Sequence, residues 1–443
     1  MLDEIGVESV DDLYVDIPDG LRLKRKMDLP PPLLSEYALR RHVTGILKNN
    51  VSCADYISFL GGGCAPHYVP SICDEVNGRG EFLTAYAGEP YDDHGRFQAL
   101  FEYASMMGEL LEMDVVNVPT YDWLQAAATS IRMASRITGR SRALVSGSVG
   151  PDVVSKILDY CKPGMTIEVV PVDAATGQVD LDALRSRLGD DVACFYFENP
   201  SYLGVIESSG AAVAGAVHAC GALAVVGVDP ASLGVLAPPA SWGADIVCGD
   251  LQPLGMHMQY GGGHAGFIAT RDEEAYVMEY PSRLFGICPT SVEGEYGFGD
   301  VAYDRTSFGV REEGKEWVGT AAALWGITAG VYLALMGPRG MRELGEGVMQ
   351  RARYAMTKLN AIEGVTAPVH DAPHFKEFAV RFDDALPSVA QINAGLLERG
   401  IFGGVDLTDV FHDLGKSALY CVTEVHTKGD IDALVGALRE VIG

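Results

Sequence analysis

The stretch GADIVCGDLQPLGMHMQYGGGHAGFIAT, residues 243–270, decides the fold of this chain. It predicts a buried strand from Ala244 to Cys248, then an irregular polar turn, the glycine run Gly261–Gly263, and a second apolar strand that ends at Thr270. Glycines inside such a pattern mark places where backbone or a ligand approaches closely. This order of elements is typical of a cofactor site in an α/β domain.

The composition narrows the classes of partner. The chain has 443 residues, 48% of them hydrophobic and 21% charged, which fits a globular protein with one large domain and one or two smaller ones. Its formal net charge of −27 excludes free nucleic acid and anionic membranes as favoured partners. No apolar run is long enough for a membrane span, and the start, MLDEIGVESVDDL, is acidic rather than signal-like.

The cysteines indicate a reducing compartment. There are nine, an odd number, without a CxxC pair and without metal-ligand spacing. We therefore expect reduced thiols, a cytoplasmic location and no metal site.

Beyond a predicted helix at 125–137, short apolar strands alternate with helices as far as residue 229. This alternation predicts a mostly parallel sheet with helices on both faces. Two of the strands end in polar residues, Glu198-Asn199 and Asp229. Because such sheets bind ligands at the carboxyl ends of their strands, these residues are candidates for a pocket.

The chain divides into three predicted parts. Residues 1–50 read as an N-terminal arm, with a short acidic helix near Val7–Leu13 and an amphipathic helix near Leu34–Leu47. Residues 51–335 read as the large α/β domain. Residues 336–443 read as a small α+β domain at the C-terminus.

Two loops that precede the predicted helix at 125–137 contain candidate binding residues. The glycines at 61–63 offer backbone amides that could face an anion, although a tight turn explains them equally well. The second loop crowds Tyr86, Glu89 and His94 with further acids and aromatics, a density that suits the mouth of a pocket.

A resemblance covers the whole length. The segments that carry it are, in chain order, IGVESVDDLYVDIPDGLRLKR at the start, FLGGGCAPHYVPSICDEV, GADIVCGDLQPLG with YGGGHAGFIATR, VYLALMGPRGMRE, EFAVRF, LLERGIFGGVDL and CVTEVHTKGDIDALVGALREV. These collinear segments resemble the P-protein family of the glycine cleavage system. Within the two-chain form of that family, they resemble the subunit 1, or α, chain. The resemblance implies the aminotransferase-like, fold-type I architecture of pyridoxal-phosphate enzymes. In that fold a lysine near the opening stretch holds the cofactor as a Schiff base. Here residues 163–314 contain no lysine.

The missing lysine fits the division of labour in that family. The resemblance implies an α2β2 heterotetramer in which pyridoxal phosphate is held by a second, lysine-bearing subunit. It also implies an oxidoreductase reaction of amino-acid metabolism, glycine decarboxylation with aminomethyl transfer to a lipoyl carrier, the H-protein. This chain would shape the active site and would not be catalytic alone, and no catalytic residue is assigned to it.

The departures from the family pattern cluster in pocket loops. The pattern TAYTPYQPEISQG appears here as TAYAGEPYDDHG, which keeps Tyr86, and the run ATSNICT appears as GKEWVGT, which keeps Thr320. These two survivors are the candidates for cofactor contact at a subunit interface. A small Gly-Ala-Thr run at a helix start is replaced by Trp123-Leu124-Gln125. An indole there blocks the approach of backbone amides to a phosphate, so we expect Trp123 to fill a vestigial hole.

The remaining candidates for a substrate pocket share polar side chains in or beside these loops: Glu89, His94, Trp123, Asn199, His264 and Lys315. A structural role is the alternative for each of them, and for Lys315 a solvated position before a helix. Because framework segments match while the loops differ, two further hypotheses stay open. The chain could serve a two-chain pyridoxal-phosphate enzyme with a different amino-acid substrate, or it could be a non-catalytic scaffold.

Overall fold

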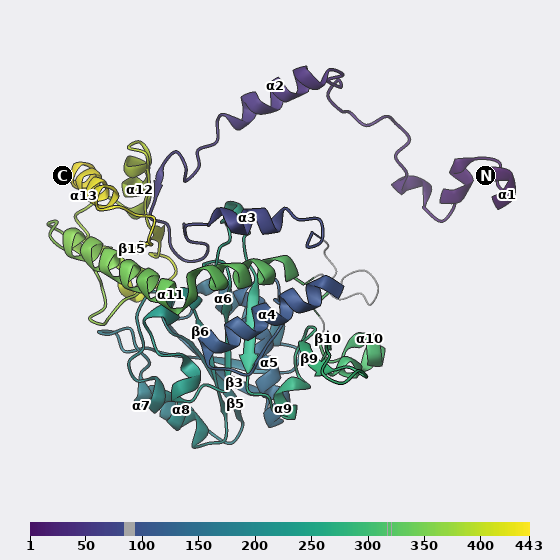
Figure 1. The fold of residues 1–443 in the computed structure, drawn as a ribbon. Helices are drawn as coiled ribbons and strands as arrows, with labels where there is room; N and C mark the ends of the chain where they lie inside the picture. The colour runs from purple at the N-terminus through teal and green to yellow at the C-terminus, as the bar shows by residue number, and fades with distance from the viewer. Residues whose placement is uncertain (84–93, 317, 320) are drawn as a thin grey trace. The chain divides into compact units, whose positions relative to one another are not determined.

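The structure is a computed structural model that describes residues 1–83, 94–316, 318–319 and 321–443, with His94 and Gly95 described by their backbone alone. The chain forms two units, Met1–Ser52 and Cys53–Gly443 (Figure 1).

The first unit contains short helices joined by extended chain. They are α1 (Leu2–Ile5), the 3-10 turns η1 (Val10–Tyr14) and η2 (Asp19–Leu21), and α2 (Glu36–Leu47). The helix expected near Val7–Leu13 is a 3-10 turn that begins later, after Ser9 at its N-cap. The amphipathic helix is present as α2, where the Ser35 hydroxyl accepts a hydrogen bond from the Ala38 N–H. No residue of α2 is buried.

The second unit is built on a seven-stranded sheet with the order β2-β8-β7-β6-β5-β3-β4. Its strands are β2 (Val115–Val116), β3 (Arg142–Ser146), β4 (Thr166–Val170), β5 (Val192–Glu198), β6 (Leu223–Val228), β7 (Ile246–Asp250) and β8 (Gly266–Thr270). From β4 to β7 every pairing is parallel, and only β8 runs against its neighbours. The mostly parallel sheet predicted from the sequence is therefore confirmed.

Burial explains why these strands are almost wholly apolar. Every residue of β5, VACFYFE, is buried, because helices cover both faces of the sheet and leave no solvated side. The helices of the large domain are α3 (Ser71–Asn77), α4 (His94–Leu111), α5 (Trp123–Thr138), α6 (Pro151–Cys161), α7 (Leu181–Arg185), α8 (Gly210–His218), α9 (Glu274–Val277) and α10 (Ser307–Val310). Short 3-10 turns join them: η3 (Pro230–Gly234), η4 (Pro239–Trp242), η5 (Gln259–Gly261), η6 (Tyr303–Arg305) and η7 (Arg311–Glu313). A hairpin of β9 (Phe285–Pro289) and β10 (Tyr296–Asp300) adds to this part.

The opening stretch folds largely as expected. The first strand, β7, lies two residues later than predicted, and it extends to Asp250 because this carboxyl is buried and hydrogen-bonded there. The returning strand β8 ends at Thr270, as predicted. Between them Gly261 has φ 91°, a left-handed conformation that other residues rarely adopt.

Two stretches of the sequence, 319–336 and 341–359, each have a pattern typical of a helix, and in the structure they form one element, α11 (Ala323–Leu359). It is interrupted at Gly337, which has φ 57° and precedes Pro338. Proline has no backbone N–H, and the left-handed glycine before it re-aims the chain, so the pattern of two helices survives as two arms of α11.

The C-terminal part is a four-stranded antiparallel sheet with its own apolar core. Its strands are β11 (Val365–Thr366), β12 (Glu377–Phe382), β15 (Ser417–Cys421) and β14 (Val405–Asp406), and its helices are α12 (Val389–Leu397) and α13 (Lys428–Ile442), with the turn η8 (His412–Leu414). β1 (Ile57–Ser58) pairs with β13 (Ile401–Phe402). Among the described residues, no helix is long and apolar enough to cross a membrane, and the nine cysteines are free thiols.

Candidate functional site

The carboxyl ends of the central parallel strands bring buried acids to one edge of the sheet. β5 ends at Glu198, Asp229 follows β6, and β7 ends at Asp250; these three side chains belong to residues only 5–6% exposed. Buried carboxyls need hydrogen bonds or charges as partners, because desolvation is costly. The partners define what this edge can do.

Trp123 closes the edge above β5 and β6. Its indole N–H donates to the Tyr196 hydroxyl at 2.9 Å, and that hydroxyl donates to Glu198 Oε1 at 3.0 Å. A Cβ placed on Gly227 would lie 2.9 Å from the indole and 2.7 Å from the Tyr196 hydroxyl. The two rings therefore lie directly against the backbone of β6, where only glycine fits. Burial raises the pKa of Glu198 to about 8, and the charge of Glu377 adds to this rise.

The N-terminus of α5 is occupied by carboxylates of the chain itself. Asp122 caps the helix by accepting from the Gln125 N–H at 2.7 Å, and Asp250 Oδ2 accepts from the Trp123 N–H at 3.1 Å. Amides at a helix start are the groups that would hold a phosphate. Here Asp122 and Asp250 already use two of them. In the glycine loop a backbone amide is likewise bonded to a carboxylate of the chain, since the Gly62 N–H donates to Glu377 Oε1 at 2.7 Å.

A buried ion-pair cluster joins the large domain to the C-terminal sheet. Lys376 Nζ lies 2.6 Å from Asp229 Oδ2 and 3.4 Å from His67 Nε2. The other ring nitrogen, His67 Nδ1, lies 2.9 Å from Glu424 Oε2, and the Tyr68 N–H donates to the same carboxylate at 2.7 Å. The two ring nitrogens of His67 thus bridge Lys376 and Glu424.

These contacts set the charges of the cluster. Burial by itself would lower the pKa of Lys376, but the Asp229 carboxylate outweighs it and the pKa is raised. Burial by itself would raise the pKa of Glu424, but His67 and the Tyr68 N–H outweigh it and hold the pKa at about 2. Lys376 is therefore an ammonium ion paired with the Asp229 carboxylate, and it cannot act as a free amine.

A second cluster lies where β7 ends and β8 begins. His264 Nδ1 lies 3.0 Å from Asp250 Oδ2, and His264 Nε2 lies 3.3 Å from Cys64 Sγ. The other oxygen of Asp250 accepts from the Gln252 and Ala265 N–H groups at 2.9 and 3.2 Å. Asp250 thus anchors the helix start, both strands and the imidazole at once.

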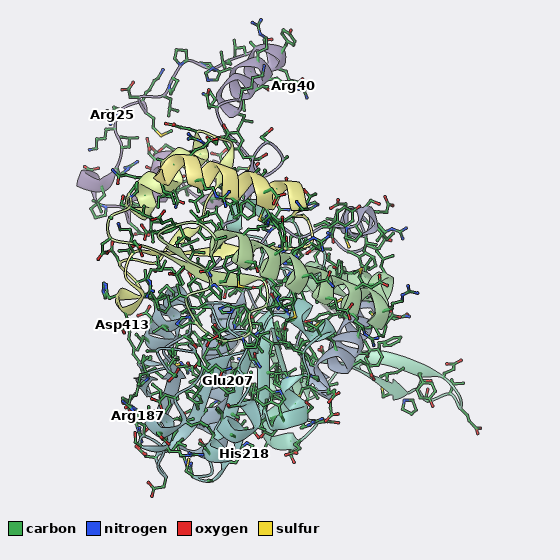
Figure 2. The ribbon with its side chains drawn as sticks, turned by 90° about the vertical axis from the view of Figure 1, so that its left-hand side faces the viewer. Arg25, Arg40, Arg187, Glu207, His218 and Asp413 are labelled. Atoms are coloured by element: carbon green, nitrogen blue, oxygen red, sulfur yellow. The ribbon has the colours of Figure 1, made fainter. Side chains whose placement is uncertain are left out.

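Two other predicted residues lie apart from these clusters. The amide of buried Asn199 bonds the backbone of Glu207, whose N–H donates to Asn199 Oδ1 at 3.1 Å and whose carbonyl accepts from Nδ2 at 3.3 Å. Glu207 is labelled in Figure 2. Lys315 pairs with Glu279, which also pairs with Arg136 near the end of α5. Since Arg136 is thirteen residues along the helix from Trp123, its backbone lies about 20 Å from the start of α5. Lys315 therefore pairs near the other end of that helix.

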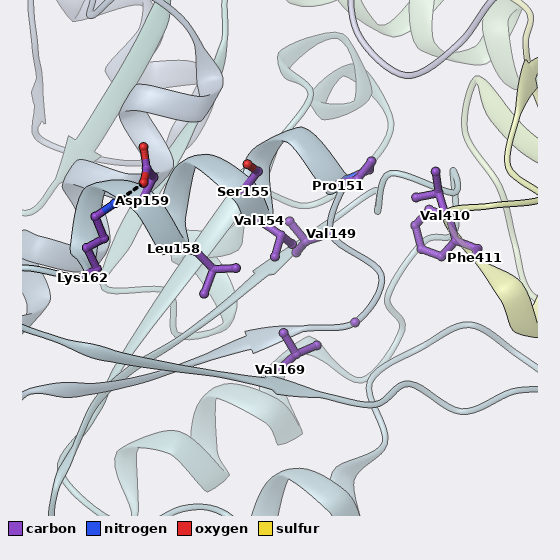
Figure 3. Close-up of a pocket in the computed structure, with 11 residues that line it drawn as sticks. Val149, Pro151, Val154, Ser155, Leu158, Asp159, Lys162, Val169, Val410 and Phe411 are labelled. Carbon is purple, nitrogen blue, oxygen red and sulfur yellow. Dashed lines mark hydrogen bonds and ion pairs between the residues drawn. The ribbon is translucent and has the colours of Figure 1, made fainter.

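A pocket of about 600 Å³ lies at the side of the sheet formed by β4, between α6, β4 and the loop before η8 (Figure 3). Its lining is mostly apolar, with the Asp159–Lys162 ion pair at one end: Gly147, Val149, Pro151, Val154, Ser155, Leu158, Asp159, Lys162, Val169, Val410 and Phe411. Of the candidates from the sequence whose side chains the structure describes, none lines it.

Comparison with known proteins gives a family match over nearly the whole chain. The family model of the glycine cleavage system P-protein matches residues 1–438. The chain belongs to this family. Two similar relatives are named probable glycine dehydrogenase (decarboxylating) subunit 1. The one from Staphylothermus marinus is 37% identical over all of this chain and 95% of its own length. The one from Aeropyrum pernix is 40% identical over all of this chain and 96% of its own length.

Solved structures agree with the family. A glycine decarboxylase (P-protein) of the glycine cleavage system, crystallised with an inhibitor, has a TM-score of 0.87 and 35% identity over all of this chain and 97% of its own. A sphingosine-1-phosphate lyase from Burkholderia pseudomallei, with a TM-score of 0.67 and 15% identity over 94% of this chain and 92% of its own, shares the fold. The expected fold-type I, aminotransferase-like architecture is confirmed.

The residues of this family member do not fit a pyridoxal phosphate held by this chain alone. The indole of Trp123 covers Gly227, and the start of α5 serves Asp122 and Asp250. The lysine that reaches the edge, Lys376, is paired with Asp229. These residues therefore support no cofactor-dependent step at this edge.

Three predicted residues, Tyr86, Glu89 and Thr320, lie outside the described residues, and for His94 only the backbone, which opens α4, is described. Conversely, Cys64, Asp250 and Lys376, the partner of Asp229, were not among the candidates from the sequence. Lys376-Glu377 directly before the apolar run of β12 was the available signal, because charges entering a buried strand require partners.

Proposed function

We propose that this chain is the lysine-lacking subunit of a two-chain glycine dehydrogenase (aminomethyl-transferring), the P-protein of a glycine cleavage system. The observation that supports this most is the match to subunit 1 relatives over the full chain. The filled carboxyl edge and the lysine-free residues 163–314 agree with it, since neither leaves a place for a covalently bound cofactor.

The partner in this proposal is a lysine-bearing second subunit that holds pyridoxal phosphate. The cofactor, when bound there, would accept the electrons released as carbon dioxide leaves glycine. A lipoyl carrier would receive the aminomethyl group, and an α2β2 assembly would work in the cytoplasm. The uncovered α2 of the arm suits a partner surface.

The residues of this chain would form one wall of that site. We propose Tyr86 and Thr320 as cofactor contacts across the interface, with Glu89 and His94 beside the substrate. Asp250 and the Lys376–Asp229 pair would act indirectly, by fixing the start of α5 and the C-terminal sheet against the large domain. In this proposal the arm is 1–50, the large domain 51–335 and the small domain 336–443.

A second candidate keeps the two-chain architecture and changes the amino-acid substrate. It is favoured by TAYAGEPYDDHG and GKEWVGT, which differ from the family pattern in pocket loops. With a rebuilt pocket, Trp123, Glu89 and His94 would determine specificity. A non-catalytic scaffold would instead bind the partner without affecting its activity.

The test is glycine–bicarbonate exchange by the complex of both subunits with a lipoyl carrier, after an absorbance scan for bound pyridoxal phosphate. Robust exchange that requires this chain supports the glycine decarboxylase. A cofactor-loaded complex without exchange contradicts it and favours another amino acid. Exchange by the partner alone, unchanged on adding this chain, leaves only the scaffold.

Two matched variants distinguish a pocket that still serves glycine from a pocket rebuilt for another amino acid. Tyr86→Phe removes one hydroxyl and should slow glycine–bicarbonate exchange. The loss of transition-state stabilisation should be about 1–3 kcal/mol if the hydrogen-bond partner of the hydroxyl stays buried. Trp123→Phe should leave exchange nearly intact, because the indole lies within this chain's own filled edge. The reverse order would assign specificity to Trp123.

A further inference from the structure

The Cys64–His264–Asp250 cluster is not used by the proposed decarboxylase. It joins three segments: the loop after β1, the residue that ends β7 and the turn that precedes β8. The groups follow in the order thiol, imidazole, carboxylate, with 3.3 Å from Sγ to Nε2 and 3.0 Å from Nδ1 to Oδ2. This is the geometry in which a carboxylate orients an imidazole that in turn contacts a nucleophile.

Asp250 and Cys64 also set the charge of the imidazole. The hydrogen bond to Asp250, followed by the contact with Cys64, raises the pKa of His264 to about 11. The ring therefore carries both hydrogens near neutral pH and donates one to Asp250 and the other to the sulfur. An imidazolium beside a sulfur stabilises the thiolate, which is the reactive form.

The sulfur can also be reached. Cys64 is partly exposed, and the His264 side chain is 26% exposed. The neighbouring Gly63 has open space where a side chain would lie. Within the described residues, no group of three or more His, Cys, Asp or Glu side chains could hold a metal ion, so metal binding does not explain this cluster.

We propose that Cys64 is a nucleophilic thiol, activated by His264 and oriented through Asp250, and that its reaction partner is a small aliphatic disulfide. Attack on a disulfide needs no oxyanion-binding group. This chemistry requires only a thiolate and an open approach.

The step is a thiol–disulfide exchange. The Cys64 thiolate attacks one sulfur of the disulfide, a new S–S bond forms to Cys64, and the original S–S bond breaks. The second sulfur leaves as a thiolate and takes a proton from water. Cys64 is oxidised and the departing sulfur is reduced, so no further oxidant is needed.

The test measures adduct formation on the full-length chain, in the complex in which it is purified, with bis(2-hydroxyethyl) disulfide at pH 6.5. Peptide mass spectrometry compares Cys64 with the exposed thiols Cys53 and Cys288 of the same molecule. An ordinary thiol is only about 1% ionised at this pH. Because the Cys64 sulfur has an imidazole nitrogen at 3.3 Å and an open approach, we expect it to react about fivefold faster than the two exposed thiols.

His264→Gln keeps a polar side chain but cannot form the imidazolium, and it should bring the rate at Cys64 down to that of Cys53. Equal rates at the three thiols of the wild type, which needs no variant to fold, would overturn the proposal. So would an unchanged rate at Cys64 in a folded His264→Gln variant.

Two further arms identify the disulfide. Faster reaction with glutathione disulfide than with lipoamide points to a linear disulfide, and the opposite order points to a strained ring. Reaction of Cys64 with neither compound would overturn the proposal.

Discussion

Replacing Glu198 by glutamine should remove a pH-dependent loss of stability. Glu198 lies at the end of β5, accepts from the Tyr196 hydroxyl at 3.0 Å, and belongs to a residue that is 5% exposed. Burial raises its pKa from 4.5 to about 8 in the folded chain. Glutamine has the same shape, still accepts from Tyr196, and does not titrate.

The sign follows from proton linkage. Between pH 4.5 and 8 the unfolded chain releases this proton while the folded chain retains it, so the free energy of unfolding falls as pH rises. The group's contribution is fully present below the unfolded pKa and is lost as pH rises through the folded pKa. At 1.36 kcal/mol per pKa unit, the wild type should lose about 3 kcal/mol between pH 5 and pH 8 that Glu198→Gln does not lose.

For a chain of this size, with an unfolding entropy of about 2.1 cal/mol/K per residue, that difference corresponds to about 3 °C in Tm. The assay is thermal unfolding of both proteins at pH 5 and pH 8, followed by circular dichroism. Trp123→Phe is the control, because it changes the same hydrogen-bonded chain without changing a titrating group, so its Tm offset should be equal at the two pH values. If wild type and Glu198→Gln lose Tm in parallel, Glu198 is not held protonated and the account of this edge is wrong.

Three further outcomes are expected. Borohydride reduction of the isolated chain with pyridoxal phosphate should give no site-specific adduct on peptide mapping, since residues 163–314 lack lysine and Lys376 is held by Asp229; a single labelled site such as Lys315 would contradict this. Lys376→Met should cost about 3–5 kcal/mol in thermal or denaturant unfolding by leaving Asp229 buried and unpaired, and adding Asp229→Asn should restore most of it. With the partner subunit present, light scattering should show the molar mass of a hetero-oligomer. We expect this complex to be obligate, with an interface of about 2,000 Å² or more. A stable monomer that does not bind the partner subunit would contradict this expectation.

Local patterns in the sequence determined much of the fold. The continuous apolar run of β5 and the alternation of strands with helices predicted a parallel sheet covered on both faces, because a strand buried on both sides has no polar positions. The same local grammar located the glycine turn at Gly261–Gly263 and the strand that ends at Thr270. The absence of lysine from residues 163–314 is likewise a property of sequence alone.

The tertiary structure decided which polar groups meet. Sequence patterns placed Asn199, His264 and Lys315 in one list of pocket candidates, yet each has different partners in space: the backbone of Glu207, the Cys64–Asp250 cluster, and Glu279. Strand and helix periods describe which face of an element is buried, but they carry no information about the side chain that comes to lie opposite.

The pairing of Lys376 with Asp229 shows the reason most directly. Each residue by itself is a charged group next to an apolar strand, and the residue that pairs with it lies far away in the chain. Only when the C-terminal sheet packs against the end of β6 does each charge find its counter-charge at 2.6 Å. Desolvation makes that partner obligatory, whereas the sequence separation keeps its identity out of any local pattern.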